Sequence, residues 1–214
     1  MKMLEDGALR VIMFENLGPF GNNAYIIADD DSKEAVMVDM PAGSAPVVAA
    51  ARDGGWTVKA ILLTHSHGDH WADYELVTSA IGAPVMAHEA ERGVLGIRIH
   101  QAVEDGQEIA VGQFAMRAIH TPGHTPGSTC FIVGRYLLSG DTLFPGGPGR
   151  TRTPADFRQT VESISTRLLT LPDETAVLTG HGDGTTIARS KQEYAAFAAR
   201  EKPADLCGDV TWAG

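Results

Sequence analysis

The chain alternates between short, β-rich apolar segments and longer segments with helical spacing of apolar residues. In the first half, five segments are apolar or β-branched and are bounded by turn residues, which predicts strands. They are residues 9–16 (LRVIMFEN), 23–28 (NAYIIA), 34–40 (EAVMVDM), 58–64 (VKAILLT) and 84–88 (PVMAH). Helices are predicted over residues 44–55, with Ser44 as N-cap, and from about Trp71 to Ile81. Residues 89–105 fit a short helix and a loop.

The second half repeats the order of strands followed by helices. Strands are predicted over residues 107–111, 113–121, 128–134 and 135–141, and in the segment 175–182 with its exit loop. The clearest helix follows the fourth of these strands, because Phe157, Val161, Ile164, Leu168 and Leu171 are spaced by four, three, four and three residues. Thr153 is its predicted N-cap, and a last helix is predicted from Thr186 to Arg200. This order predicts two α/β halves whose sheets pack face to face with helices outside, within a single domain of residues 1–214.

Composition narrows the class of protein. The chain has 214 residues, of which 43% are apolar, and its net charge is −10 without a basic cluster. A nucleic-acid partner or an anionic membrane surface would call for a positive patch, so neither is expected. Cys130 and Cys207 are far apart in the sequence and predict no disulfide framework. Because the N-terminus has no secretory h-region and no apolar run approaches the ~18 residues that span a bilayer, a soluble, cytoplasmic protein is expected.

The polar segment THSHGDH directly follows one of the predicted strands. With independent positions at this composition, the pattern HxHxDH arises by chance in roughly one chain of this length in a thousand. In an extended segment, residues two apart point the same way, so His65 and His67 can bind one ion. Gly68 lets the chain turn, and Asp69 and His70 can then face a neighbouring position.

Three further candidate ligands follow predicted strands or lie in glycine-rich turns. His124 lies in TPGHTPGS, Asp141 in LLSGDTLF and His181 in VLTGHGDG. At such positions the backbone can approach an ion closely. A tetrahedral site needs four ligands, so seven candidates fit two ions if one carboxylate bridges them. The seven are His65, His67, Asp69, His70, His124, Asp141 and His181.

The order of these motifs resembles that of the metallo-β-lactamase superfamily, from about Asn22 to His181. The resemblance implies an α/β fold, an αββα four-layer sandwich, with the metal site at one edge between the two sheets. It also implies that His65, His67 and His124 hold the first ion, that Asp69, His70 and His181 hold the second, and that Asp141 bridges the two. Asp39, in VDMP, resembles the family's carboxylate that orients a ligating histidine from outside the ligand set.

The resemblance implies metal-assisted hydrolysis of an activated acyl bond in a small thioester or ester. Two divalent ions would share a water whose pKa falls toward ~7, and Asp69 would orient the hydroxide. Zinc is the default metal, and the same ligands accept iron or manganese. Aspartate at position 141, where β-lactamases with two zincs commonly have cysteine, favours a thioesterase similar to glyoxalase II, that is, of the hydroxyacylglutathione hydrolase type. GDTLF followed by a glycine-rich loop resembles that branch, and Arg150 and Arg152 are candidates for contacting an anionic substrate.

Departures from that branch leave the acyl group, the thiol carrier and the oligomeric state open. Glyoxalase II enzymes have a tyrosine two positions after the basic residue that follows the loop, and this chain has Arg152 there. Because 33 residues follow His181, from 182 to 214, we also expect their C-terminal helical domain to be absent. Another thiol carrier, an ester or a lactone therefore fits as well.

Two other classes of protein remain as alternatives. Persulfide dioxygenases share the fold and keep HxHxDH but bind one iron and use oxygen. Their typical GRTDFQ and AHD contexts differ from GRTRTP and GHGDG in this chain, which favours a hydrolase. A purely structural metal protein is disfavoured, because structural sites are closed whereas seven ligands around two ions leave positions open to water.

Overall fold

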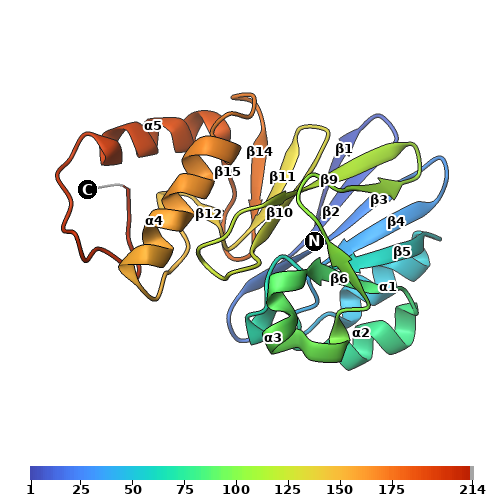
Figure 1. The fold of residues 1–214 in the computed structure, drawn as a ribbon. Helices are drawn as coiled ribbons and strands as arrows, with labels where there is room; N and C mark the ends of the chain where they lie inside the picture. The colour runs from blue at the N-terminus through green and yellow to red at the C-terminus, as the bar shows by residue number, and fades with distance from the viewer. Residues whose placement is uncertain (213–214) are drawn as a thin grey trace.

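Two β-sheets pack face to face in the structure, a computed structural model that describes residues 1–212 (Figure 1). In spatial order, the first sheet contains β1 (Lys2–Asp6), β2 (Leu9–Leu17), β3 (Asn22–Asp29), β4 (Glu34–Val38), β5 (Thr57–Leu62), β6 (Val85–His88) and β7 (Gln101–Val103). The second contains β15 (Thr185–Thr186), β14 (Ala176–Thr179), β11 (Tyr136–Gly140), β10 (Thr129–Val133), β9 (Phe114–His120) and β8 (Glu108–Val111). The short strands β12 (Leu143–Phe144) and β13 (Gly147–Pro148) pair with each other.

The direction of the strands changes within each sheet. From β1 to β4 neighbouring strands are antiparallel, and from β4 to β7 they are parallel. In the second sheet, β11 and β14 form the parallel pair, and the other pairs are antiparallel. Parallel strands run in the same direction, so their carboxyl ends lie at the same edge of the sheet. This places the ends of β4 and β5 side by side, and likewise those of β11 and β14.

Helices cover the outer face of each sheet (Figure 1). The first sheet is covered by α1 (Ala45–Asp53), α2 (Tyr74–Ile81) and α3 (Arg92–Leu95), and the second by α4 (Pro154–Ser163) and α5 (Ile187–Ala198). Short 3-10 turns occur at η1 (Gly68–His70), η2 (Glu89–Glu91) and η3 (Gly96–Arg98), and a π-helical turn, η4 (Ile164–Leu168), continues α4. Within residues 1–212, no helix combines the length and the apolar character needed to cross a bilayer.

The period-2 alternation of the strands accounts for the layers. In β2, Val11 packs between the two sheets, whereas its neighbour Ile12 packs under the helices of the first sheet. In β3, Ile27 and Ile26 divide in the same way. Strands of both sheets are therefore buried on two faces, and the apolar residues form three layers, one between the sheets and one under each set of helices. This confirms the predicted αββα four-layer sandwich.

The element boundaries follow the sequence pattern with local exceptions. The predicted N-cap Thr153 accepts a hydrogen bond from the backbone N–H of Asp156, whose carboxylate accepts one in return, so α4 begins with a capping box. Ser44 stands at the N-cap of α1, but its hydroxyl donates to the carbonyl of Pro41 instead of capping the helix. The two cysteines are free thiols, as predicted.

Several segments differ from the sequence prediction. The short strands β7, β12, β13 and β15 were not predicted, and β7 lies within residues 89–105, where only a short helix and a loop were expected. The strand β1 was not expected, because four of its five residues are exposed and show no alternation of apolar and polar positions. The helix α2 starts at Tyr74 and not at Trp71. Trp71 follows η1 with a non-helical backbone, at φ −138° and ψ 24°, and the N–H of Asp73 donates to the carbonyl of Met40 at 3.0 Å.

Replacing Phe131 by alanine is expected to destabilise the protein by about 3–5 kcal/mol, the usual range for removing a buried aromatic ring. Phe131 is 0% exposed and packs between the two sheets, so the substitution leaves a cavity where both sheets lose contacts. Chemical denaturation followed by circular dichroism measures the free energy of unfolding. The matched control is Ile97→Ala, which removes a 92% exposed side chain and should change stability by less than about 0.5 kcal/mol.

Candidate metal centre

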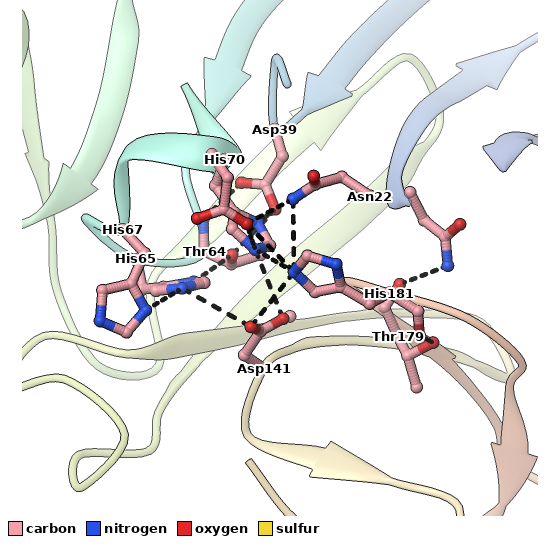
Figure 2. Close-up of polar contacts among 12 residues, drawn as sticks. Asn22, Asp39, Thr64, His65, His67, His70, Asp141, Thr179 and His181 are labelled. Carbon is pink, nitrogen blue, oxygen red and sulfur yellow. Dashed lines mark hydrogen bonds and ion pairs between the residues drawn. The ribbon is translucent and has the colours of Figure 1, made fainter. Parts of the chain in front are cut away.

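Side chains from strand ends of both sheets gather in one cluster (Figure 2). The segment THSHGDH follows β5, Asp141 follows β11 and His181 follows β14, while His124 lies in the turn between β9 and β10. The structure thus brings all seven candidate ligands together. They fall into overlapping groups whose ligand atoms lie within 4.8 Å of one another, namely His65, His67 and His124; His65, His70 and Asp141; and Asp69, His70 and His181.

The close approach of β11 to the exit of β5 depends on Gly140. This residue has φ +48°, and a Cβ atom there would lie 2.6 Å from Cβ of Thr64. Only glycine combines this backbone conformation with this contact. The glycine that precedes Asp141 therefore allows a carboxylate from the second sheet to reach histidines that belong to the first.

The first triad, which consists of His65, His67 and His124, presents ring nitrogens to a common point. Nε2 of His65 lies 3.1 Å from Nδ1 of His67, which lies 2.9 Å from Nε2 of His124. Nitrogen ligands of one tetrahedral zinc lie about 3.3 Å apart, given Zn–N bonds of about 2.0–2.1 Å. The spacing of the first triad therefore fits one divalent ion.

The second triad, which consists of Asp69, His70 and His181, has a similar spacing. Nε2 of His181 lies 3.1 Å from Nε2 of His70 and 3.2 Å from Oδ2 of Asp69. Nε2 of His70 lies 3.6 Å from the same carboxylate oxygen. This mixed nitrogen and oxygen set fits a second ion of the zinc, iron or manganese type.

Asp141 lies between the two triads. Its Oδ2 atom is 3.7 Å from Nε2 of His124 and 3.4 Å from Nε2 of His181. Its Oδ1 atom is 3.4 Å from Nε2 of His70, and among residues 1–212 it has no hydrogen-bond partner although it is buried. A buried carboxylate oxygen without a donor is costly, and a bridging position between two cations would satisfy it.

The ring nitrogens that face away from the cluster are held by hydrogen bonds. Nδ1 of His70 lies 2.8 Å from Oδ2 of Asp39, whose carboxylate also accepts from the backbone N–H and the hydroxyl of Thr64, both at 2.9 Å. Nδ1 of His124 lies 2.8 Å from the carbonyl of Arg150. Nδ1 of His181 lies 3.0 Å from the carbonyl of Phe20. These contacts fix each ring so that Nε2 faces the cluster, as metal-binding histidines require.

The sequence did not indicate Asn22 as part of the site. This buried side chain donates from Nδ2 to Oδ2 of Asp69 at 2.8 Å, and the same atom lies 3.3 Å from Nε2 of His181. An asparagine at the start of a strand carries no ligand signature, so only the fold reveals the contact. Nor did the sequence indicate Phe20 and Arg150 as backbone acceptors for histidine rings.

Charges within the cluster divide the histidines into two sets. Burial lowers the pKa of His65, His67 and His124, so the rings of the first triad are neutral at neutral pH. For His70, burial alone would lower the pKa, but the carboxylates of Asp39 and Asp141 outweigh it and raise the pKa well above its usual value.

The second triad also contains a histidine and a carboxylate that stabilise each other's charge. The pKa of His181 rises to about 10, because hydrogen bonds to Asp141 and Asp69 outweigh the effect of burial. The pKa of Asp69 falls well below its usual value, mainly because of its hydrogen bond with His181. The negative charge beside the second triad therefore suits a cation.

The two arginines predicted to contact substrate differ in position. The guanidinium of Arg150 is exposed and lies 3.7 Å from the carboxylate of Asp209. Arg152 is also exposed and lines a cavity of about 500 Å³ together with His67 and His124. Both line a further cavity of about 630 Å³ beside the first triad, so both lie at the approach to the cluster.

Another cavity, of about 590 Å³, opens beside His124, Asp141 and His181. One wall is the glycine-rich loop of residues 144–150, and the opposite wall includes Asp209, Val210 and Thr211. This C-terminal segment is fixed by two hydrogen bonds between Thr151 and Gly208, at 3.0 and 3.2 Å, and by the buried side chain of Trp212. Residues after His181 therefore help to shape the approach to the candidate centre.

Comparison with known proteins agrees with this geometry. The sequence model of a family described as the Metallo-beta-lactamase superfamily matches residues 17–181. The chain is 32% identical to the "Probable metallo-hydrolase YqgX" of Bacillus subtilis (strain 168), over 83% of this chain and 92% of that protein. It is 34% identical to a hydroxyacylglutathione hydrolase of Enterobacter sp. (strain 638), over 87% of this chain and 69% of that protein.

Solved structures with the same fold carry different names. The B3 metallo-beta-lactamase BLEG-1 has a TM-score of 0.75 and 31% identity, covering 85% of this chain and 96% of that one. ETHE1 from Myxococcus xanthus has a TM-score of 0.75 and 25% identity, covering 89% and 86%. TTHA1623 in a di-iron-bound form has a TM-score of 0.72 and 30% identity, covering 84% and 97%.

Filling the second triad with zinc near neutral pH is expected to release at least one proton, whereas filling the first releases almost none. His181 and His70 have raised pKa values and must lose a proton to bind, whereas the rings of the first triad are already neutral. Lowering the pH should therefore weaken the second ion more than the first. Isothermal titration calorimetry in buffers of different ionisation enthalpy counts the protons, and equal release for both ions would contradict the assignment.

Proposed function

Since the chain belongs to the metallo-β-lactamase superfamily, we propose that it is a dinuclear metal-dependent hydrolase that cleaves small thioesters. One observation carries the proposal. Six histidine and aspartate side chains form two triads. The seventh candidate, Asp141, lies between them with one buried carboxylate oxygen that has no hydrogen bond among residues 1–212.

In this proposal His65, His67 and His124 hold the first ion, Asp69, His70 and His181 hold the second, and Asp141 bridges them. When bound, the ions would lower the pKa of a shared water to ~7 and polarise the substrate carbonyl. Zinc is the default metal. Iron or manganese suits the same ligands, and a similar protein has been solved in a di-iron-bound form.

The surrounding side chains orient the reacting groups. Asn22 donates to one oxygen of the Asp69 carboxylate and so fixes its rotamer, which leaves Asp69 able to accept a hydrogen bond from the attacking water. Asp39 holds a proton on Nδ1 of His70 and keeps Nε2 free for an ion. Burial of the first triad limits competing water around the reacting carbonyl.

The thioester assignment draws on the ligand set and on the cavity walls. Aspartate occupies position 141, and the chain is 34% identical to a hydroxyacylglutathione hydrolase over 87% of its own length. In our proposal Arg150 and Arg152, both at the approach, attract the anionic arm of a thiol carrier. The chain spans 69% of that relative, so glutathione itself is one candidate carrier among other small thiols.

The rival reaction implied by the family resemblance is that of a persulfide dioxygenase with one iron. Such enzymes keep HxHxDH, so this motif does not separate the two reactions. The GRTRTP and GHGDG contexts of this chain and the spacing of Asp69, His70 and His181 support the hydrolase proposal. A lactone substrate needs no change of ligands, whereas aspartate at position 141 disfavours a β-lactam substrate. Activity assays with each class of substrate therefore distinguish these alternatives from a thioesterase.

Protein purified without added metal is expected to contain two ions per chain and to release thiol from S-D-lactoylglutathione or from a simple thioester. Mass spectrometry of the metals gives the stoichiometry, and a chromogenic thiol reagent gives the rate. A chromogenic β-lactam and a lactone serve as comparison substrates and should react more slowly. One iron per chain with persulfide-dependent oxygen uptake would overturn the proposal.

Replacing Asp141 by alanine is expected to lower metal content toward zero or one ion per chain and to lower kcat/KM by about 100-fold or more, because both ions lose a ligand. Asp53→Ala, which removes an exposed carboxylate at the end of α1, is the control and should match the wild type. Full dinuclear occupancy in the Asp141 variant, with activity retained, would show that this carboxylate does not bridge.

A further inference from the structure

The ligand His124 lies in the middle of a loop and not at the end of a strand. The loop TPGHTPGS joins β9 to β10, and the three other ligand-bearing segments leave strands directly. Backbone hydrogen bonds close the loop on itself, from Thr121 N–H to the Ser128 carbonyl at 2.7 Å and from Gly123 N–H to the Thr125 carbonyl at 3.1 Å. The position of the loop relative to the other ligands depends on contacts with other elements, one of which is the hydrogen bond from the Ser163 hydroxyl to the Pro122 carbonyl at 2.9 Å. The contact of Nδ1 with the Arg150 carbonyl orients the ring but does not by itself fix the loop.

A buried carboxylate from another element holds the part of the loop that follows His124. Glu91, at the end of η2, is 1% exposed, and its Oε1 atom accepts a hydrogen bond from the hydroxyl of Thr125 at 2.7 Å. The same oxygen accepts from the backbone N–H of Gly127. The residue directly after His124 and the residue three after it are therefore attached to one oxygen atom.

The hydrogen bonds continue from Thr125 to Ser128. The two hydroxyls lie 2.7 Å apart, and the hydroxyl of Ser128 also accepts from the backbone N–H of Thr125 at 3.0 Å. On the next residue, the backbone N–H of Thr129 donates to the carbonyl of Thr64, beside the first ligand of THSHGDH, at 2.9 Å. The loop is thus connected both to Glu91 and to the segment that carries His65 and His67.

Gly127 gives independent evidence that the approach of the carboxylate matters. A Cβ atom at this position would lie 2.6 Å from Oε1 of Glu91, which no real side chain tolerates without displacement. The φ angle of Gly127 is not in the left-handed region, so the turn itself does not demand glycine. The second glycine of TPGHTPGS is explained by Glu91 and not by backbone conformation.

We propose that Glu91 is a positioning residue for His124, which holds the loop so that the first triad can bind its ion. The inference rests on the proposed metal-binding role of that triad. A carboxylate buried this deeply is costly unless charge-assisted hydrogen bonds compensate it, and here both donors belong to the loop. Removing it leaves the Gly127 N–H without its acceptor and leaves Ser128 as the remaining partner of the Thr125 hydroxyl.

The test measures metal binding without any substrate. In Glu91→Ala, the affinity of the first ion is expected to fall by about 10–100-fold, the usual effect of losing a group that orients a ligand, while the second ion binds as in the wild type. Cobalt substitution reports the geometry, so the absorption bands of the first ion should shift or weaken. Chelator competition gives both affinities, and thermal unfolding of the metal-free variant shows whether it is folded.

Matched variants separate positioning from general stability. Glu91→Gln keeps an oxygen that both donors can reach and should restore most of the affinity. Thr125→Val removes one donor with little change of shape and should lower the affinity of the first ion in the same direction as Glu91→Ala. Glu89→Ala, two residues earlier on the same turn, removes an exposed carboxylate that pairs with Arg92 and should change neither ion.

If Glu91→Ala does not fold, the metal affinities of Glu91→Gln and Thr125→Val test the positioning role of Glu91 instead. Wild-type affinity and cobalt spectrum in a folded Glu91→Ala, or in Thr125→Val, would overturn the inference. Equal weakening of both ions would also overturn it, since that indicates a structural role alone. A wild-type protein that binds one ion would refute the dinuclear function but leave this test valid for the first triad.

Discussion

The buried carboxylate of Asp39 is the interaction on which the arrangement of the candidate centre depends. It accepts hydrogen bonds from the backbone and hydroxyl of Thr64, where the polar turn begins, and it lies 2.8 Å from Nδ1 of His70, where the turn ends. Asp39 follows β4, the strand paired with β5, and it holds this position with φ +60°. Removing Asp39 would deprive Thr64 and His70 of their common buried partner, so this one carboxylate holds both ends of the turn.

The layered fold was predictable because alternation and helical spacing are properties of short segments. Val11 and Ile12 point to opposite faces whichever strand lies next to them, and Thr153 with Asp156 marks the start of a helix by itself. What could not be predicted came from tertiary context. The strand β1 has no buried face of its own to mark it. The start of α2 is displaced because Trp71 has a non-helical backbone and the N–H of Asp73 donates to the carbonyl of Met40, in a distant segment. Whether all 214 residues form one domain stays a prediction.

The seven candidate ligands could be named from the sequence because each lies in a short motif of distinctive residues, and the structure brings them together. Their roles as ligands stay a prediction. The groups around them were not predictable, because they act through atoms without any motif. Arg150 is the clearest case, since its carbonyl contacts His124 while its guanidinium lies near Asp209. Asn22 and Glu91 likewise acquire their contacts only when distant segments meet.

The C-terminal segment lines the approach to the centre, whereas the candidate ligands come from other parts of the chain. Residues 207–211 line the approach to the centre but contribute none of the seven side chains, and they are fixed through Thr151 and Trp212. Substitutions in this wall can therefore alter which molecules enter while leaving the ligand positions untouched. Two proteins with the same seven side chains can therefore catalyse the same reaction on different substrates. Conversely, a comparison of substrate specificity among such proteins should include the segment equivalent to residues 207–211, which supplies none of the candidate ligands.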